Sequence, residues 1–315
     1  MENLNIGVHI LAANAKGLVD RIVEAEEAGI DTAWMTVGGV AADPFAVFAV
    51  AAQRTSRIEF GTSIVPTFPR HPLAMAQGAA TVDSFAPGRL KLGVGPSHKP
   101  AIEGTWGLNF DRPLEHLREY VTILNSILKD GKVDFHGKRL TAVAQIAAPT
   151  QVRVMISALR HNAFKLAGEI SEGGISWVMP LPSIKTIADP AIREGATAAG
   201  RAKPPVVVHV PVVVSEDSAA VVAAGSKQFG FYPRLPFYSS MWQDAGCDEA
   251  AKGEFSERMA QALIISGDAE TVATRIRDIP NSGGNEIICS IVNMDDGGEA
   301  AKRTLRLLGQ LAQGK

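Results

Sequence analysis

The segment Arg89-Leu90-Lys91-Leu92-Gly93-Val94-Gly95 alternates large apolar residues with polar or very small ones. This period of two predicts a β-strand, because successive side chains of a strand point to opposite faces. In a parallel sheet surrounded by helices, the bulky apolar set packs against the helices and the other set faces inward. We therefore expect the leucines and the valine to face helices, and Lys91, Gly93 and Gly95 to face the interior.

Seven further strand-like segments alternate with helical stretches along the chain. This alternation indicates a parallel sheet with crossover helices, and eight such units are typical of a closed (β/α)8 TIM barrel. No linker rich in Pro, Gly and Ser divides the sequence, so we expect a single domain over residues 1–315. The expected strands are Leu4–Leu11, Thr32–Thr36, Ile58–Ile64, Arg89–Val94, Arg153–Ser157, Gly174–Met179, Val206–Val214 and Glu286–Val292.

Helix signals fall between these strands. Asp43-Pro44 and His71-Pro72 each place a proline where a helix begins, a position at which its missing N–H costs nothing. Residues Arg112–Lys129 carry apolar side chains at spacings of three and four, which predicts a helix with one face on the barrel. Two irregular insertion segments, Asp130–Pro149 and Phe229–Gly253, are candidates for a lid.

The bulk composition favours a small-molecule partner. The chain has 315 residues, a formal charge of −2 and no long run of one sign, so the basic surface that nucleic acid or anionic lipid requires is missing. No apolar run is long enough to cross a membrane, and Met1-Glu2-Asn3 does not begin a signal peptide. Two isolated cysteines suit a reducing compartment, and we expect a cytoplasmic protein.

The same parity rule places small polar groups at one rim of the barrel. It turns His9, Thr36, Ser63 and Ser157 toward the interior near the ends of their strands. Gly93 and Gly95 would leave a wall without side chains, as close approach of a flat ring requires. A tight turn explains the same two glycines equally well.

The segment Ser157-Ala158-Leu159-Arg160 leads from the fifth strand into a helix. Free backbone N–H groups at a helix start, together with an arginine, stabilise an anion such as a phosphate. Simple capping by Ser157 and a solvated Arg160 remain the alternative.

Two histidines are candidates for proton transfer. His9 faces inward and His98 follows the fourth strand, although a structural role is an open alternative for both. The sequence contains no H-E-x-x-H, no G-x-S-x-G and no carboxylate pair at ligand spacing, so we expect neither a metal site nor serine-hydrolase chemistry.

Taken in order along the chain, four stretches give the sequence a family resemblance. It resembles the bacterial luciferase-like superfamily, and within it the branch that depends on the deazaflavin coenzyme F420. The stretches are Gly61-Thr62-Ser63-Ile64-Val65-Pro66, Arg89–Gly95, Arg112–Tyr120, and Ser157–Arg160 with Leu166-Ala167-Gly168-Glu169.

The resemblance implies that the cofactor ring lies at the strand ends, on a bulge with a cis non-proline peptide at Ser63-Ile64. It implies cofactor contacts from Thr36, Thr62, Ser63, Ile64, Gly93 and Gly95, a phosphate clamp at Ser157, Ala158, Leu159 and Arg160, and a homodimer. The sugar-phosphate dehydrogenases of that branch carry an Asp-His pair and two glutamates at positions that here hold Thr36-Val37, Ala13 and Ser97. This departure favours an apolar or neutral polar substrate, with proton transfer by His9, His98 or water.

Three functions fit this resemblance. The first is hydride transfer between coenzyme F420 and a small organic substrate. The second is an FMN-dependent monooxygenase, since both reactions use the same barrel mouth. The third is a flavin-binding protein without catalytic activity.

Overall fold

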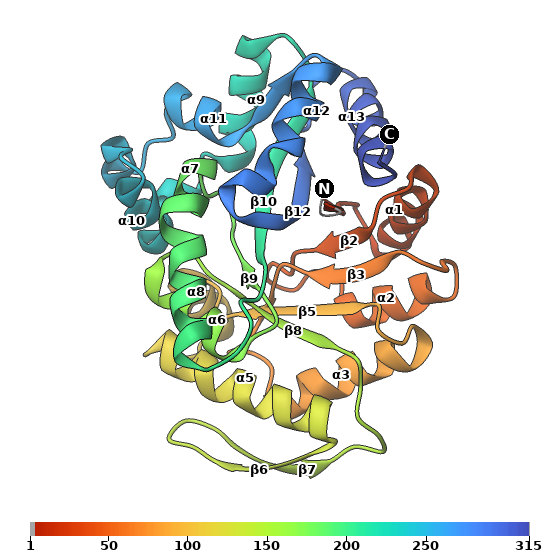
Figure 1. Cartoon of the computed structure of the whole chain (residues 1–315), viewed down its shortest axis with the longest axis vertical. Coiled ribbons are helices and arrows are strands. Elements are labelled where there is room, and N and C mark those ends of the chain that lie inside the picture. Colours follow the sequence, from red (N-terminus) through yellow and green to blue (C-terminus); the bar gives the residue numbers. More distant parts are fainter. Residues whose placement is uncertain (1–3, 315) are drawn as a thin grey trace.

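Eight parallel strands close into a barrel in the computed structural model, which describes residues 4–314 except the side chain of Asn285 (Figure 1). The ring runs β1, β2, β3, β5, β8, β9, β10 and β12, and β12 pairs with β1 to complete it. The predicted TIM barrel is therefore confirmed. The strands are β1 (Asn5–His9), β2 (Thr32–Met35), β3 (Glu59–Thr62), β5 (Leu90–Gly95), β8 (Arg153–Ser157), β9 (Gly174–Ile175), β10 (Val206–Val214) and β12 (Gly284–Ile291).

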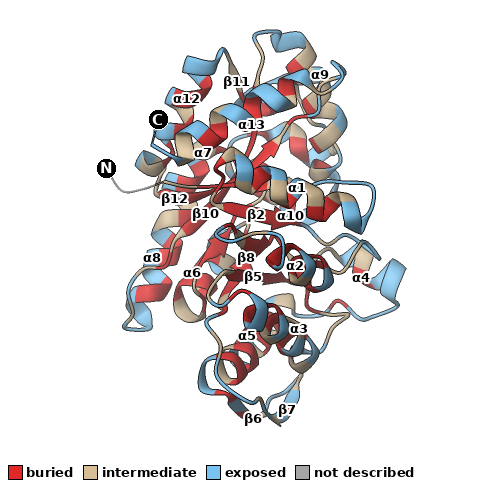
Figure 2. Ribbon diagram, turned by 90° about the vertical axis from the view of Figure 1, so that its right-hand side faces the viewer, coloured by how far each residue is buried: buried red, intermediate tan, exposed pale blue. Residues whose placement is uncertain are grey.

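The strand faces carry two separate apolar clusters. Leu90, Leu92 and Val94 of β5 belong to the large cluster that the helices cover, as their parity predicted. A small second cluster fills the inside of the barrel, and it consists of Trp34, Met155, Ile175, Val207 and Ile288. Figure 2 shows the buried strands at the centre of the molecule.

Trp34 determines how tightly the strands around it pack. A Cβ atom at Gly7 or at Gly61 would collide with its indole ring. The two inward glycines of β1 and β3 therefore make room for one large side chain from the strand between them.

Helices cover the outside of the barrel. Asp43 and His71 cap two of them through side-chain acceptors, with Pro44 and Pro72 in the first turn, as expected. No helix in residues 4–314 has the length and apolarity needed to span a membrane. The helices are α1 (Ala15–Ala28), α2 (Pro44–Ala52), α3 (Pro72–Phe85), α4 (Lys99–Trp106), α5 (Pro113–Asp130), α6 (His161–Ile170), α7 (Leu181–Ser183), α8 (Asp189–Ala198), α9 (Ser218–Phe229), α10 (Pro236–Asp244), α11 (Glu257–Leu263), α12 (Ala269–Arg277) and α13 (Glu299–Ala312).

Several strands end earlier than the sequence predicted, and two of them lead into irregular backbone. The predicted strand over Gly174–Met179 is only two residues long, because the backbone turns at Val178 with a φ of 46°. The strand predicted over Ile58–Ile64 ends at Thr62 and is followed by a bulge and by β4 (Val65–Pro66), which pairs with β5.

The two predicted insertion segments fold differently and lie in different places. The segment after α5 forms an antiparallel hairpin of β6 (Lys132–His136) and β7 (Thr141–Gln145), which lies against α5 and α3 (Figure 1). The segment after α9 contains α10, α11 and β11 (Ile265–Gly267), which pairs with the end of β10. Only this second segment reaches the cavity described below, so the hairpin is not a lid.

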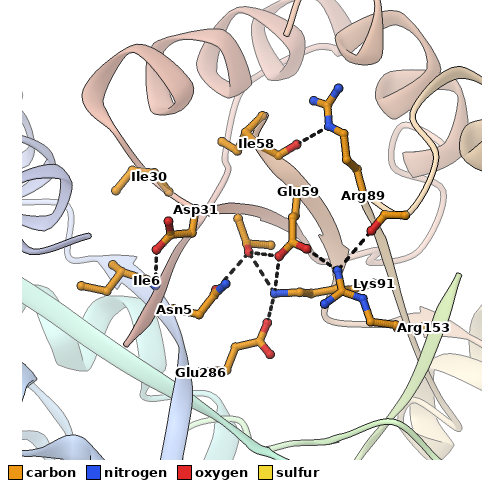
Figure 3. Close-up of polar contacts among 12 residues, drawn as sticks. Asn5, Ile6, Ile30, Asp31, Ile58, Glu59, Arg89, Lys91, Arg153 and Glu286 are labelled. Carbon is orange, nitrogen blue, oxygen red and sulfur yellow. Dashed lines mark hydrogen bonds and ion pairs between the residues drawn. The ribbon is translucent and has the colours of Figure 1, made fainter. Parts of the chain in front are cut away.

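A buried charge network closes the N-terminal end of the barrel (Figure 3). The Lys91 ammonium is 1% exposed; it lies 2.7 Å from the Glu59 carboxylate, contacts Glu286, and donates to the Thr32 hydroxyl at 3.1 Å. Arg153 pairs with the other oxygen of Glu59. Burial alone would raise the pKa of Glu59, but the charges of Lys91 and Arg153 bring it below its usual value. The four charges balance and tie β5, β3, β12 and β8 together.

We predict that Lys91→Met lowers the free energy of unfolding by about 3 kcal/mol, because it leaves two carboxylates partly buried without their shared cation. Urea denaturation at pH 7 measures this. Adding Glu286→Gln removes one unpaired charge and is expected to restore part of the loss. A double variant less stable than Lys91→Met would contradict this account.

Candidate active-site cavity

A cavity of about 760 Å³ opens at the C-terminal ends of the barrel strands. Active sites of TIM barrels lie at this end, and the volume suits a cofactor together with a small substrate. Its lining comes from the segments after five strands and from α10. The lining includes Thr36, Val37, Gly38, Gly39, Ser63, Ile64, Pro96, Ser97, His98, Arg112, Glu115, Ser157, Leu159, Arg160, Asn162, Trp177, Phe231, Tyr232, Phe237 and Tyr238.

Backbone strain gathers around this cavity. In residues 4–314 three residues other than glycine have a clearly positive φ, and they are Ser97, Arg112 and Val178. The first two line the cavity and the third follows Trp177, which also lines it. Such backbone costs about 1–3 kcal/mol per residue and persists where the surroundings impose it, which is common at functional sites.

The bulge after β3 forms one wall of the cavity. The peptide bond Ser63-Ile64 is cis, as the family resemblance implied. The end of β2 holds this bulge, since the Thr36 hydroxyl donates to the Ser63 carbonyl at 2.9 Å and Ser63 N–H donates to Met35 O at 2.8 Å. Ile64 lines the cavity and packs against the small cluster inside the barrel.

Three predicted contact residues support the bulge without lining the cavity. The Thr62 hydroxyl is buried and donates to Gly93 O at 2.7 Å. A Cβ at Gly93 would collide with Thr62 O, and one at Gly95 with the Ser157 hydroxyl. The space beside each glycine is filled by neighbouring protein atoms. The expectation that Gly93 and Gly95 leave a surface without side chains for a flat ring is therefore corrected.

The segment before α6 lines the cavity next to the bulge, since a Cβ at Gly95 would meet both the Ser157 hydroxyl and the Ile64 side chain. Ser157, Leu159 and Arg160 line the cavity, whereas Ala158 is buried and its N–H donates to Ile175 O at 2.9 Å. Helix α6 begins after Arg160 without a side-chain cap. The Arg160 guanidinium instead reaches across to Asp244 at the end of α10, with Nε 2.7 Å from the carboxylate.

His9 lies outside the cavity lining, next to Trp177, whose ring meets its own edge-on at 5.4 Å. Its Nδ1 faces the Ser290 hydroxyl at 3.4 Å, and its Nε2 is buried without a hydrogen-bond partner in the described part of the chain. Burial lowers the pKa of His9 to about 4. The ring is therefore neutral at neutral pH.

His98 does line the cavity, at the start of α4. Its ring meets that of Tyr238 edge-on, with the centroids 5.5 Å apart. Burial lowers the pKa of this histidine as well. Of the two predicted histidines, only His98 is thus placed to touch a substrate.

An aromatic wall is the part of the site that the sequence did not identify. It consists of Trp177, Phe231, Tyr232, Phe237 and Tyr238. The Tyr232 and Tyr238 rings are 4.7 Å apart. The aromatic residues that follow α9 in the sequence could have indicated this wall. That they line the cavity is seen only when α10 folds over the strand ends.

A family model described as luciferase-like monooxygenase matches residues 5–286, most of the barrel. The chain belongs to the luciferase-like monooxygenase family. Among its relatives is an F420-dependent glucose-6-phosphate dehydrogenase of Nocardia farcinica, 29% identical over 293 residues that cover 86% of each chain.

Among the solved structures that share the fold of the present chain are two enzymes with different cofactors. One is an F420-dependent secondary alcohol dehydrogenase in complex with an F420-acetone adduct, at a TM-score of 0.81 and 19% identity, with 97% and 99% of the two chains covered. The other is a type II Baeyer-Villiger monooxygenase of Pseudomonas putida in complex with FMN, at a TM-score of 0.74 and 17% identity, with 99% of both chains covered.

The pKa of His9 makes a prediction about acid stability. Because its folded-state pKa is about 4 and an unfolded histidine titrates near 6.5, its contribution to stability is complete above about pH 6.5 and is lost as the pH falls toward 4. We expect the His9 ring protons to titrate near 4 by NMR, and the variant His9→Gln to lose less stability than the wild type between these pH values. A midpoint for His9 near 6.5 would contradict its burial.

Proposed function

We propose that this luciferase-like protein binds coenzyme F420 and transfers a hydride between it and a small, neutral organic substrate. The observation that carries the proposal is the cavity itself. A bulge with Ile64 and the start of α6 form its walls on one side, and uncharged aromatic side chains form the other. The similarity to F420-dependent relatives over most of the chain supports the choice of cofactor.

The residues present fit a ring cofactor with a phosphate. Ser63 and Ile64 offer backbone and an apolar surface for the ring, and Thr36 fixes the bulge from behind. Next to the bulge, the uncapped start of α6 would supply N–H donors for a phosphate, and Arg160, which pairs with Asp244, would add positive charge. When bound, the cofactor would supply the hydride chemistry, and the protein supplies position and the exclusion of water.

The cavity walls favour a neutral substrate over a sugar phosphate. By the family resemblance, the places where sugar-phosphate dehydrogenases carry acid and base groups hold Thr36-Val37, Ala13 and Ser97. Of these, Thr36, Val37 and Ser97 line this cavity, and Ala13 does not. Glu115 is the one carboxylate in the lining set, and Arg112 lies 3.4 Å from it. Both arginines of the lining set pair with carboxylates, Arg112 with Glu115 and Arg160 with Asp244. Since Arg160 is assigned to the cofactor, this set offers no further free cation for a second phosphate, although a named relative acts on glucose 6-phosphate.

An FMN-dependent monooxygenase is the second candidate, favoured by the fold shared with an FMN complex. Titration of the purified protein with F420 and with FMN, followed by absorbance and fluorescence, separates the two. We expect saturable binding of F420, and reduction of ketones or enones by its reduced form. Binding of FMN alone, with oxygen consumption by reduced FMN, would replace the first proposal by the second.

Binding of a cofactor without turnover of any ketone, alcohol or enone would instead support a flavin-binding protein without catalytic activity.

Arg160→Ala is predicted to weaken F420 binding about tenfold, because one charge-assisted hydrogen bond to the phosphate is lost. The matched control is Arg21→Ala, which removes an exposed arginine that, within residues 4–314, forms an ion pair with Glu24 on α1. Equal affinities of the Arg160→Ala variant and the wild type would place the phosphate elsewhere.

A further inference from the structure

The Tyr232 hydroxyl has one of its hydrogen bonds fixed by the protein. Trp177 Nε1 donates to it at 2.7 Å, and both side chains line the cavity. An indole N–H is a donor only, so the tyrosine oxygen must accept. The O–H of Tyr232 therefore remains available to donate to another acceptor, and the cavity is the space beside it.

Trp177 is itself held in place by His209, which neighbouring residues fix in turn. Its ring stacks on His209 with the centroids 3.7 Å apart and the planes 12° from parallel. The next residue, Val178, donates its N–H to His209 Nδ1 at 3.0 Å, in a left-handed conformation that a β-branched residue rarely adopts. Since Nδ1 accepts, the proton of His209 is on Nε2, which donates to the Ser290 hydroxyl at 2.7 Å.

Two other ionisable groups of the cavity, His98 and Glu115, are less suited to give up a proton. His98 is neutral because burial lowers its pKa, and Glu115 is paired with Arg112. Burial raises the pKa of Tyr232, and the hydrogen bond from Trp177 opposes that rise. The phenol thus keeps its proton at neutral pH, while the indole N–H is ready to stabilise the anion that forms when the proton leaves.

We propose that Tyr232 is the catalytic proton donor of this cavity, and that Trp177, fixed by His209, is its positioning residue. The inference rests on the proposed function and adds to it the substrate class, a neutral ketone, aldehyde or the matching alcohol. In reduction, the bound deazaflavin would supply the hydride, and with it the two electrons, for the new C–H bond. The carbonyl oxygen, which gains the π pair, would take the Tyr232 proton, and the tyrosinate would regain a proton from solvent. Alcohol oxidation reverses each step.

The first test compares two variants that each lose one hydroxyl from the same wall. With reduced F420 and acetone, cyclohexanone and 2-cyclohexenone as probes, Tyr232→Phe is expected to lower kcat about a hundredfold, with KM and F420 affinity nearly unchanged. Tyr238→Phe is the matched comparison on the adjacent ring, and its kcat is expected to fall at least tenfold less than that of Tyr232→Phe. Trp177→Phe is expected to show an intermediate loss and an altered pH profile.

The second test does not depend on turnover. The chain has only three tyrosines, so protein labelled with 3-fluorotyrosine gives three ¹⁹F resonances that single Tyr→Phe variants assign. We expect Trp177→Phe to raise the pKa of Tyr232 and to leave that of Tyr120, whose hydroxyl donates to Arg70 O, unchanged. In F420-loaded protein, cyclohexanone should shift the Tyr232 resonance saturably.

Failure of this inference differs from failure of the proposed function. If the wild type binds F420 and reduces a probe, and Tyr232→Phe retains kcat within threefold, the inference is overturned while the proposed function stands. If no ketone shifts the Tyr232 resonance in F420-loaded protein, the assignment of Tyr232 is equally wrong. If the wild type binds no F420 at all, the proposed function fails, and the inference fails with it.

Discussion

The packing of the barrel interior is the constraint on which the rest of the structure depends. At the N-terminal end, Lys91 lies between the carboxylates of Glu59 and Glu286 and joins three strands that are distant in the sequence. Above this network, Trp34 fills the space that Gly7 and Gly61 leave open. The charge network and the indole ring occupy the lower half of the barrel interior, and the cavity lies at the C-terminal rim, where the strand ends meet the loops.

At this rim, hydrogen bonds from neighbouring residues hold the backbone in rare conformations, namely the cis peptide at Ser63-Ile64 and the positive φ at Val178. Thr36 and Met35 hold the bulge at Ser63, and Thr62 ties it to β5 through Gly93. On the other side, His209 accepts the N–H of Val178 and supports the Trp177 ring. Each of these contacts comes from a neighbouring strand, so the rigid barrel determines where the cavity walls stand.

The covering segment after α9 gives the site its chemical character. It brings two tyrosines and two phenylalanines over the strand ends, and Asp244 of α10 meets Arg160 at the start of α6. The cavity therefore has a polar side on the barrel, which includes Ser63, Ser157 and Arg160, and a largely aromatic side on the cover. This division supports a charged cofactor and a neutral substrate as its occupants.

The sequence by itself determined the barrel, the inward and outward faces of β1, β2, β3, β5 and β8, and several helix starts, because these follow from local periodicity and capping. It also brought Ser63, Ile64 and Arg160 to notice as site residues through the family resemblance. Only the tertiary structure decided that Gly93 and Gly95 accommodate protein atoms, that His9 lies outside the cavity, and that Tyr232 meets Trp177 across 55 positions. The physical reason is that these contacts join segments far apart in the sequence, where no local pattern records which side chain fills which space.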